Sequence, residues 1–137
     1  MIKESEELIA QSDIVLLELE IPFETVRFAA ELAKIHGKTV ILNPKPPEIL
    51  DDAFLKNIDI IVPNDLTCGA ICDMEIKSTE DYKEASEYLY SKGIKHVIVN
   101  LGIKVPFITM ELSIKTYQHR RLKPSIQQPQ EMLSLVR

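Results

Sequence analysis

The sequence has no tryptophan, few aromatic side chains and only four glycines in 137 residues. It also has no apolar run close to the roughly 20 residues that a membrane-spanning helix needs. Its first ten residues, MIKESEELIA, are acidic and lack the apolar centre of a secretory signal peptide. We therefore expect a cytoplasmic protein with no membrane partner. The length suits a single domain with one hydrophobic core.

The four glycines are too scattered to form the common phosphate-binding loops. They lie at Gly37, Gly69, Gly93 and Gly102, and no two are spaced for a GxGxxG or a Walker loop. Such loops cluster glycines because several backbone N–H groups must converge on one phosphate. The GxSxG motif of a nucleophilic serine is absent as well. This pattern argues against a dinucleotide-dependent dehydrogenase, a P-loop nucleotidase and an α/β-hydrolase.

The two cysteines, Cys68 and Cys72, are four residues apart in the stretch LTCGAIC. On a helix they would share a face, but a zinc site normally takes four ligands. The three histidines lie far away in the sequence and show no metal-ligand spacing. We therefore expect two small apolar side chains packed beneath a short helix, and no metal site.

The net charge of −5 is unevenly distributed. From Ser113 onward the chain carries five basic residues against one acid, Glu131. A basic tail is a candidate contact for nucleic acid or for an acidic partner. The acidic body and the low aromatic content instead favour a solvated chain end, so we expect no nucleic-acid partner.

Four apolar runs of strand length recur along the chain. They cover residues 12–20, 38–44, 57–64 and 95–102 and are rich in valine, isoleucine and leucine. Their apolar residues are nearly continuous instead of alternating with polar ones. This is typical of strands that are buried on both faces, as in a parallel sheet.

Helical segments separate the apolar runs. Residues 22–37 begin at a proline and end at His36 and Gly37, which suits a left-handed cap. Residues 78–93 begin with Ser78 or Thr79 as the N-cap, carry acids in the first turn and stop at Gly93. Shorter helices are predicted for residues 48–57 and 65–73, and one more for residues 2–11.

This alternation predicts an α/β fold: a Rossmann-like, three-layer parallel sheet with helices on both faces. After Gly102 the rhythm changes, because VPFITM and SIKTYQ lie close together and suggest a β-hairpin. We expect one domain with three parts: a βαβ core over residues 1–102, a hairpin over 103–119 and an irregular tail over 120–137.

Polar residues stand where each of the four predicted strands ends. In open α/β sheets, ligands bind outside the carboxyl ends of the strands. The same residue types also favour ordinary loops, so composition leaves a ligand site and plain loop chemistry equally open. The residues at these strand ends are Glu18 and Glu20, Asn43, Asn64 and Asp65, and Asn100 and Gly102.

Four of these motifs, in this order, resemble the central part of the ribokinase-like carbohydrate kinases. The four motifs lie in three segments, the first of which contains two of them: IVLLELEIPFETVRFAAELAKIHGKTVILNPKPP, LKNIDIIVPN and EASEYLYSKGIKHVIVNLG. The family has a strand ending in Leu-Glu before a helix started by proline, then strands ending in Asn-Pro, in Pro-Asn and in Thr-Leu-Gly. The resemblance covers residues 2–102, about three quarters of the chain.

The resemblance implies a partial ribokinase-like fold that handles ATP, Mg²⁺ and a sugar. Glu20 matches the acid beside the sugar pocket, and Asn43 ends the neighbouring strand and joins it as a substrate contact. Asn64 matches the asparagine near the phosphates and the water shell of the magnesium ion. The implied nucleotide-binding set is completed by Asn100, Gly102 and Lys104.

Several family features are missing from this sequence. Thr67 stands where the family has an acid three residues after the asparagine, and Asn100 stands where threonine is usual. The Gly-Ala-Gly-Asp segment, which supplies the anion hole and the catalytic base in the family, is absent. The N-terminal lid region is absent too. We therefore expect no catalytic residue in this chain and no phosphoryl transfer at a useful rate.

Three interpretations remain open at this point. The chain is a truncated or degenerate sugar kinase, a non-catalytic module that binds nucleotide or sugar, or an interaction module whose ligand sites are vestigial. Removing the start of a doubly wound sheet leaves apolar surface without its usual neighbour. For this reason we also expect a homodimer or a larger homo-oligomer.

Overall fold

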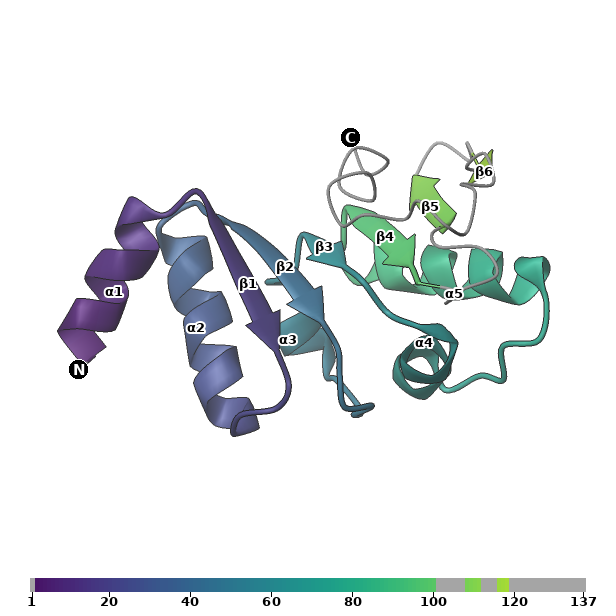
Figure 1. The fold of residues 1–137 in the computed structure, drawn as a ribbon, viewed down its shortest axis with the longest axis horizontal. Coiled ribbons are helices and arrows are strands. Elements are labelled where there is room, and N and C mark those ends of the chain that lie inside the picture. Colours follow the sequence, from purple (N-terminus) through teal and green to yellow (C-terminus); the bar gives the residue numbers. More distant parts are fainter. Residues whose placement is uncertain (1, 101–107, 112–115, 119–137) are drawn as a thin grey trace, which may run out of the picture.

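The computed structural model describes residues 2–100, 108–111 and 116–118. All nine elements predicted before Gly102 are present, each near its expected place (Figure 1). These nine are α1 (Ile2–Gln11), β1 (Ile14–Glu18), α2 (Phe23–Ile35), β2 (Thr39–Asn43), α3 (Asp52–Leu55), β3 (Ile60–Ile61), α4 (Asp65–Cys72), α5 (Thr79–Ser91) and β4 (His96–Val99). Two further strands follow, β5 (Ile108–Glu111) and β6 (Thr116–Gln118).

The strands form one sheet in the order β1-β2-β3-β4-β5-β6, which is also their order along the chain. β1 to β4 are parallel, whereas β5 pairs antiparallel with β4 and with β6. The α/β class, the parallel core and the antiparallel pairing of the expected hairpin strands are therefore confirmed. The expected irregular tail over residues 120–137 lies outside the described residues.

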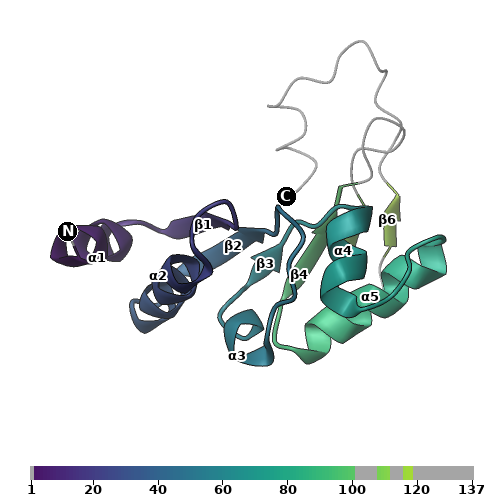
Figure 2. The same cartoon turned by 90° about the horizontal axis from the view of Figure 1, so that it is seen from below.

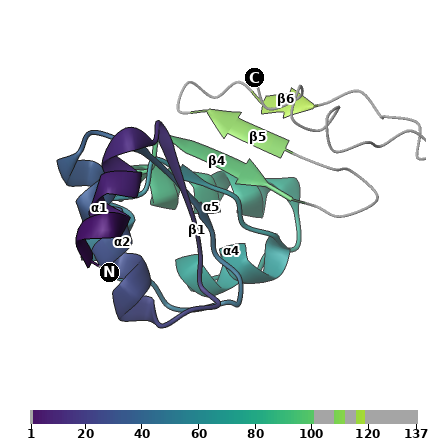
Figure 3. The same ribbon diagram turned by 60° about the vertical axis from the view of Figure 1, so that its left-hand side comes forward.

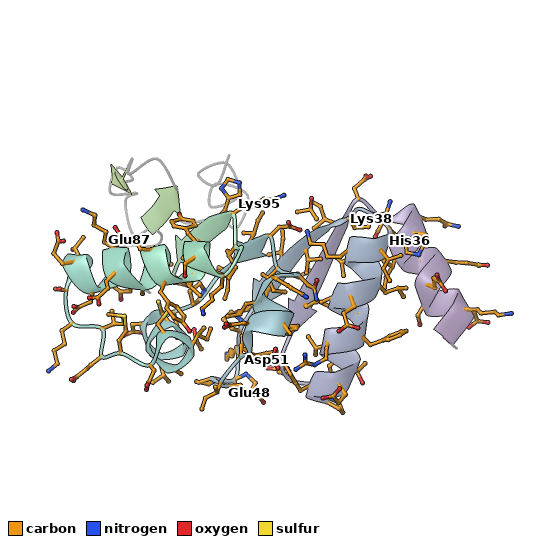
Figure 4. All side chains as sticks on the ribbon, turned by 180° about the vertical axis from the view of Figure 1, so that it is seen from behind. His36, Lys38, Glu48, Asp51, Glu87 and Lys95 are labelled. Carbon is orange, nitrogen blue, oxygen red and sulfur yellow. The ribbon has the colours of Figure 1, made fainter. Side chains whose placement is uncertain are left out.

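The described residues supply one helical layer, where we expected two. Figure 1 shows β1 and β2 in front of α2 and α3, and Figure 4, seen from behind, shows these helices in front of the strands. Figure 2 places α2, α3 and α5 on the same side of the sheet. The reason is topological: parallel crossovers are right-handed, so strands that always advance in one direction return every helix to the same face.

The other face of the sheet is consequently open over β1. Leu17 of β1 and Val40 and Leu42 of β2 point to the helices and are buried. Their neighbours Ile14 and Leu16 point the other way and keep 57% and 66% of their surface exposed. β1 is therefore apolar on both faces, and the apolar side chains on its open face, Ile14 and Leu16, have no helix over them.

The core lies between the sheet and the helical layer. Its largest fully buried side chains include Phe54 of α3, Leu89 of α5, and Ile61 and Val97 from the central strands. α1 lies apart from this layer and packs beside α2, where His36 contacts Glu6 (Figure 3). In the part of the chain that the structure describes, no helix combines the length and apolar character needed to cross a membrane.

Candidate functional site

The parallel strands bring the four predicted strand ends to one edge of the sheet, which we call the carboxyl edge. Figure 4 makes the two edges distinct: Lys38 and Lys95, which precede β2 and β4, lie at the top. Glu48 and Asp51, from the segment that follows β2, lie at the bottom. Residues that follow β1, β2, β3 and β4 therefore share the lower edge in this view.

A carboxylate and an amide meet at the ends of β1 and β2. The Nδ2 atom of Asn43 donates a hydrogen bond of 3.1 Å to Oε1 of Glu18, because the parallel register sets these two residues side by side. Both groups lie on the open face. Glu20, which the resemblance matches to the acid beside the sugar pocket, is exposed two residues beyond the end of β1. The residue that Asn43 bonds to is Glu18.

Asn64 is held in place as the N-cap of α4. Its Oδ1 accepts a hydrogen bond of 2.8 Å from the Thr67 backbone amide, and the Thr67 hydroxyl accepts one of 2.8 Å from the Asn64 amide. This reciprocal pair is a capping box, with threonine in place of the usual glutamate or glutamine. The side-chain oxygen of Asn64 is therefore engaged, which leaves its Nδ2 as the group that could donate to a ligand.

The ends of β3 and β4 are also joined. Asn64 and Asn100 form an isolated parallel bridge, and the Asn100 amide donates to the carbonyl of Pro63 at 2.9 Å. Two members of the predicted nucleotide-binding set, Asn64 and Asn100, thus lie side by side. The two remaining members, Gly102 and Lys104, lie outside the described residues.

The described part of the carboxyl edge carries more acids than bases. Glu18, Glu20 and Asp65 are exposed there. Arg27, in the first half of α2, is paired with Asp51, and its hydrogen bond holds the pKa of Asp51 below its ordinary value. Lys45, in the loop after β2, is exposed and is a cation that a phosphate could reach.

Nothing in the described residues resembles a resident metal centre. Within them, no three histidine, cysteine, aspartate or glutamate side chains group closely enough to hold a metal ion. The two cysteines pack beneath a short helix, as expected. Cys68 is buried and Cys72 half-buried between α4 and α5, both thiols are free, and Sγ of Cys72 lies 3.7 Å from the carbonyl oxygen of Ala85.

A wide pocket of about 590 Å³ opens beside α4, and of the described strand-end residues only Asp65 lines it. Its lining includes three acids, Asp65, Asp73 and Glu75. Gly69 of α4 and Met74 of the turn that follows α4 also line it. Neither Asn64 nor Asn100 lines this pocket. We therefore place the candidate nucleotide contacts at the carboxyl edge, where these two residues come together.

Sequence reasoning missed two features of this edge. The spacing of Thr67 after Asn64 is that of a capping box, but the usual signal has glutamate or glutamine at this position and not threonine. The pairing of Glu18 with Asn43 was not readable, because it depends on the register between β1 and β2. Sequence alone does not fix that register.

Comparison with known proteins places this arrangement in a family. The model of the pfkB family of carbohydrate kinases matches residues 1–105. A ribokinase from Haemophilus influenzae is 38% identical over 109 residues, which are 80% of this chain and 36% of that protein. A ribokinase from Staphylococcus aureus is 36% identical over 98 residues, which are 72% of this chain and 32% of that protein.

Solved structures give the same result. The structure of Arabidopsis thaliana ribokinase complexed with ribose and ATP superposes with a TM-score of 0.77 at 27% identity, over 85% of this chain and 37% of that one. Ribokinase from Thermotoga maritima gives a TM-score of 0.71 at 29% identity, over 86% of this chain and 38% of that one. The chain thus spans about a third of the length of the relatives that it matches. It belongs to the pfkB family of carbohydrate kinases.

Proposed function

We propose that this chain binds a magnesium-bound adenine nucleotide at its carboxyl edge and, by itself, does not transfer the phosphoryl group. The observation that carries the proposal is the junction of Asn64 and Asn100 at the ends of β3 and β4. Family membership supports the choice of ligand, since one relative of known structure is a ribokinase complexed with ribose and ATP.

Asn64 suits a phosphate contact because of how it is held. Its capping bonds fix the side chain and occupy Oδ1, so the amide group presents donors and not acceptors to a ligand. Donors are what phosphate oxygens require. The first-turn amides of α4 are less suitable: Thr67 N bonds to Asn64, and Leu66 N bonds to Asp65 at 3.0 Å. The helix N-terminus itself therefore contributes little to anion binding.

Magnesium is part of the proposal because of the charge at this edge. A free triphosphate would approach the exposed carboxylates of Glu18, Glu20 and Asp65 and be repelled. Mg²⁺ is commonly held by one or two carboxylates together with the phosphates of the substrate, so the described acids fit it in that role. The bound ion would neutralise phosphate charge. We therefore expect nucleotide binding to be weaker without it.

The sugar contacts are proposed with the same reasoning. Asn43 donates through Nδ2 to Glu18, which leaves its Oδ1 to accept from a hydroxyl group. Glu20 lies two residues after Glu18 and is exposed. A carboxylate and an amide oxygen are suitable acceptors for the hydroxyl groups of a carbohydrate.

The proposal of no catalysis rests on missing chemistry. Phosphoryl transfer depends on positioning and charge stabilisation, with a base that accepts the hydroxyl proton. Loss of a single anion-hole donor typically costs about a hundredfold or more in rate. Here the sequence contains no Gly-Ala-Gly-Asp segment at all.

Titration calorimetry with ATP and ADP, each with Mg²⁺ and again with a chelator, tests the binding. We expect saturable binding that weakens in the chelator. In Asn64→Asp the capping acceptor is retained but the amide donors are lost and a charge is added, so binding should weaken by at least about tenfold while the thermal midpoint stays close to that of wild type.

Asn57→Ala is the matched control. Asn57 lies before β3, at the opposite end of that strand, and its Nδ2 bonds to the carbonyl of Ala53. The control should leave nucleotide binding unchanged. An absence of binding by the wild-type chain, or equal affinity in Asn64→Asp, would contradict the proposed site.

A further inference from the structure

Among the residues that the structure describes, β1 lies at one edge of the sheet: it pairs with β2 and with no other strand. In Figure 1 it is the outermost strand of the sheet, and α1 lies beyond α2. Edge strands of natural proteins are usually protected by proline, lysine, a bulge or a covering segment. The sequence of β1, IVLLE, contains neither proline nor lysine.

The backbone groups of Ile14, Leu16 and Glu18 point to this free edge. The carbonyl of Asp13 accepts from Thr39 of β2, and the amide of Leu19 donates to Lys45 beyond β2. Odd-numbered residues of β1 therefore bond inward, and in an extended strand the even-numbered residues bond outward. The same three residues place their side chains on the open face, where Ile14 and Leu16 are largely exposed.

We propose that β1 pairs antiparallel with β1 of a second copy of this chain, around a two-fold axis at Leu16. In this register Leu16 lies opposite Leu16 of the second copy, and Ile14 lies opposite Glu18. All three pairs use residues whose N–H and C=O groups point outward, so each exchanges both of its hydrogen bonds. The two central leucines are brought into contact, and such cross-strand apolar pairs stabilise a sheet.

Charge selects this arrangement over its alternatives. An axis at Glu18 would set two carboxylates directly opposite each other, which is destabilising. A parallel pairing in matched register would also bring the two Glu18 side chains together. An axis at Ile14 would set Glu18 against Ala10, which is part of α1 and has no strand edge. The axis at Leu16 separates the acids and uses the whole length of β1.

Two lysine substitutions on the same face test the register. Leu16→Lys places two like charges opposite each other across the axis, whereas Ile14→Lys places each lysine opposite Glu18 of the second copy. Both replace an exposed apolar side chain, so the monomer should tolerate both; circular dichroism and thermal melting check this. Ile49→Lys, at a residue that is 90% exposed outside the sheet, is the control for a general loss of surface apolarity.

We expect sedimentation velocity of the full chain to show a dimer. Leu16→Lys should raise its dissociation constant by at least about tenfold, and Ile14→Lys and Ile49→Lys should leave it within about threefold of wild type. A monomeric wild-type chain would overturn the proposal, and so would equal weakening by Leu16→Lys and Ile14→Lys.

A cross-linking variant keeps the test decisive if Leu16→Lys fails to fold. Directly opposed residues of a hydrogen-bonded antiparallel pair have Cα atoms about 5.5 Å apart, within the range that a disulfide spans. Leu16→Cys should therefore oxidise to a covalent dimer, and Ile49→Cys should not. Failure of Leu16→Cys to cross-link under conditions where the protein is folded would reject the axis at Leu16.

Discussion

At the scale of single residues, Asp59 shows how one buried charge organises the amino ends of the strands. It lies just before β3, and its Oδ2 accepts a 2.8 Å hydrogen bond from the amide of Val40. Its Oδ1 pairs with Lys34 and lies 3.5 Å from Nζ of Lys95. Burial acts to raise the pKa of Asp59, but these hydrogen bonds and charges outweigh it and hold the pKa below its ordinary value.

We predict that Asp59→Asn lowers the free energy of unfolding by about 2 kcal/mol at neutral pH, since hydrogen bonds to a charged group are lost. A carboxylate whose pKa is depressed by folding adds stability above its unfolded value, near 3.9, and loses it as the pH falls through the folded value. Urea unfolding of both proteins from pH 7 downward should therefore show the difference narrowing below about pH 4. A difference that is constant with pH would contradict this role.

At the scale of secondary-structure elements, α4 is fixed at both ends by its own sequence. The capping box of Asn64 and Thr67 begins it, and Asp73, with a left-handed backbone at φ = 51°, ends it. The chain then turns so sharply that the carbonyl oxygen of Met74 approaches Gly69. A Cβ atom added to Gly69 would lie 2.7 Å from that oxygen. Glycine is required there by packing, although its own φ is ordinary for a helix.

We predict that Gly69→Ala destabilises the protein by about 1–3 kcal/mol, because the backbone of the turn must shift to make room. Without this contact, the same change in a helix would stabilise by roughly 1 kcal/mol, so the sign of the effect is decisive. Leu66→Ala, at an exposed position of the same helix, should change stability by less than about 0.5 kcal/mol. Chemical denaturation of the three proteins measures both effects; stabilisation by Gly69→Ala would refute the close approach.

The elements could be predicted from sequence because their signals are local. The proline before α2, the glycine after it and Ser78 before α5 mark helix ends within a few residues of the observed bounds. The third apolar run was less informative: only Ile60 and Ile61 of residues 57–64 form β3. The single helical layer and the bond between Glu18 and Asn43 depend on which strands become neighbours and in which register. These are contacts between distant parts of the chain, so local patterns did not reveal them.

At the scale of the whole molecule, the chain has the fold of its family over a part of the family's length. The matched region covers residues 1–105, and the relatives are about three times longer than the segment they share with it. Asn64 and Asn100 lie side by side at the carboxyl edge. The Gly-Ala-Gly-Asp segment of the family does not occur in this sequence.

We predict that the isolated chain turns over ribose, fructose or adenosine at less than about 0.1 s⁻¹, compared with about 1–100 s⁻¹ for typical kinases. A coupled assay of ADP release measures this, with a full-length ribokinase assayed in parallel as the positive control. Faster turnover would show that the chain assembles an anion hole and a base from residues other than the family's own.

The agreement between strand order in space and strand order along the chain also bears on how the protein is made. Every strand from β2 onward is added at the growing border of the sheet, beside the strand made before it. No strand has to wait for a later one or insert between two earlier ones. Synthesis on the ribosome proceeds from the N-terminus at about 5–20 residues per second. Each strand of the described sheet therefore finds the strand that it pairs with already made when it leaves the ribosome.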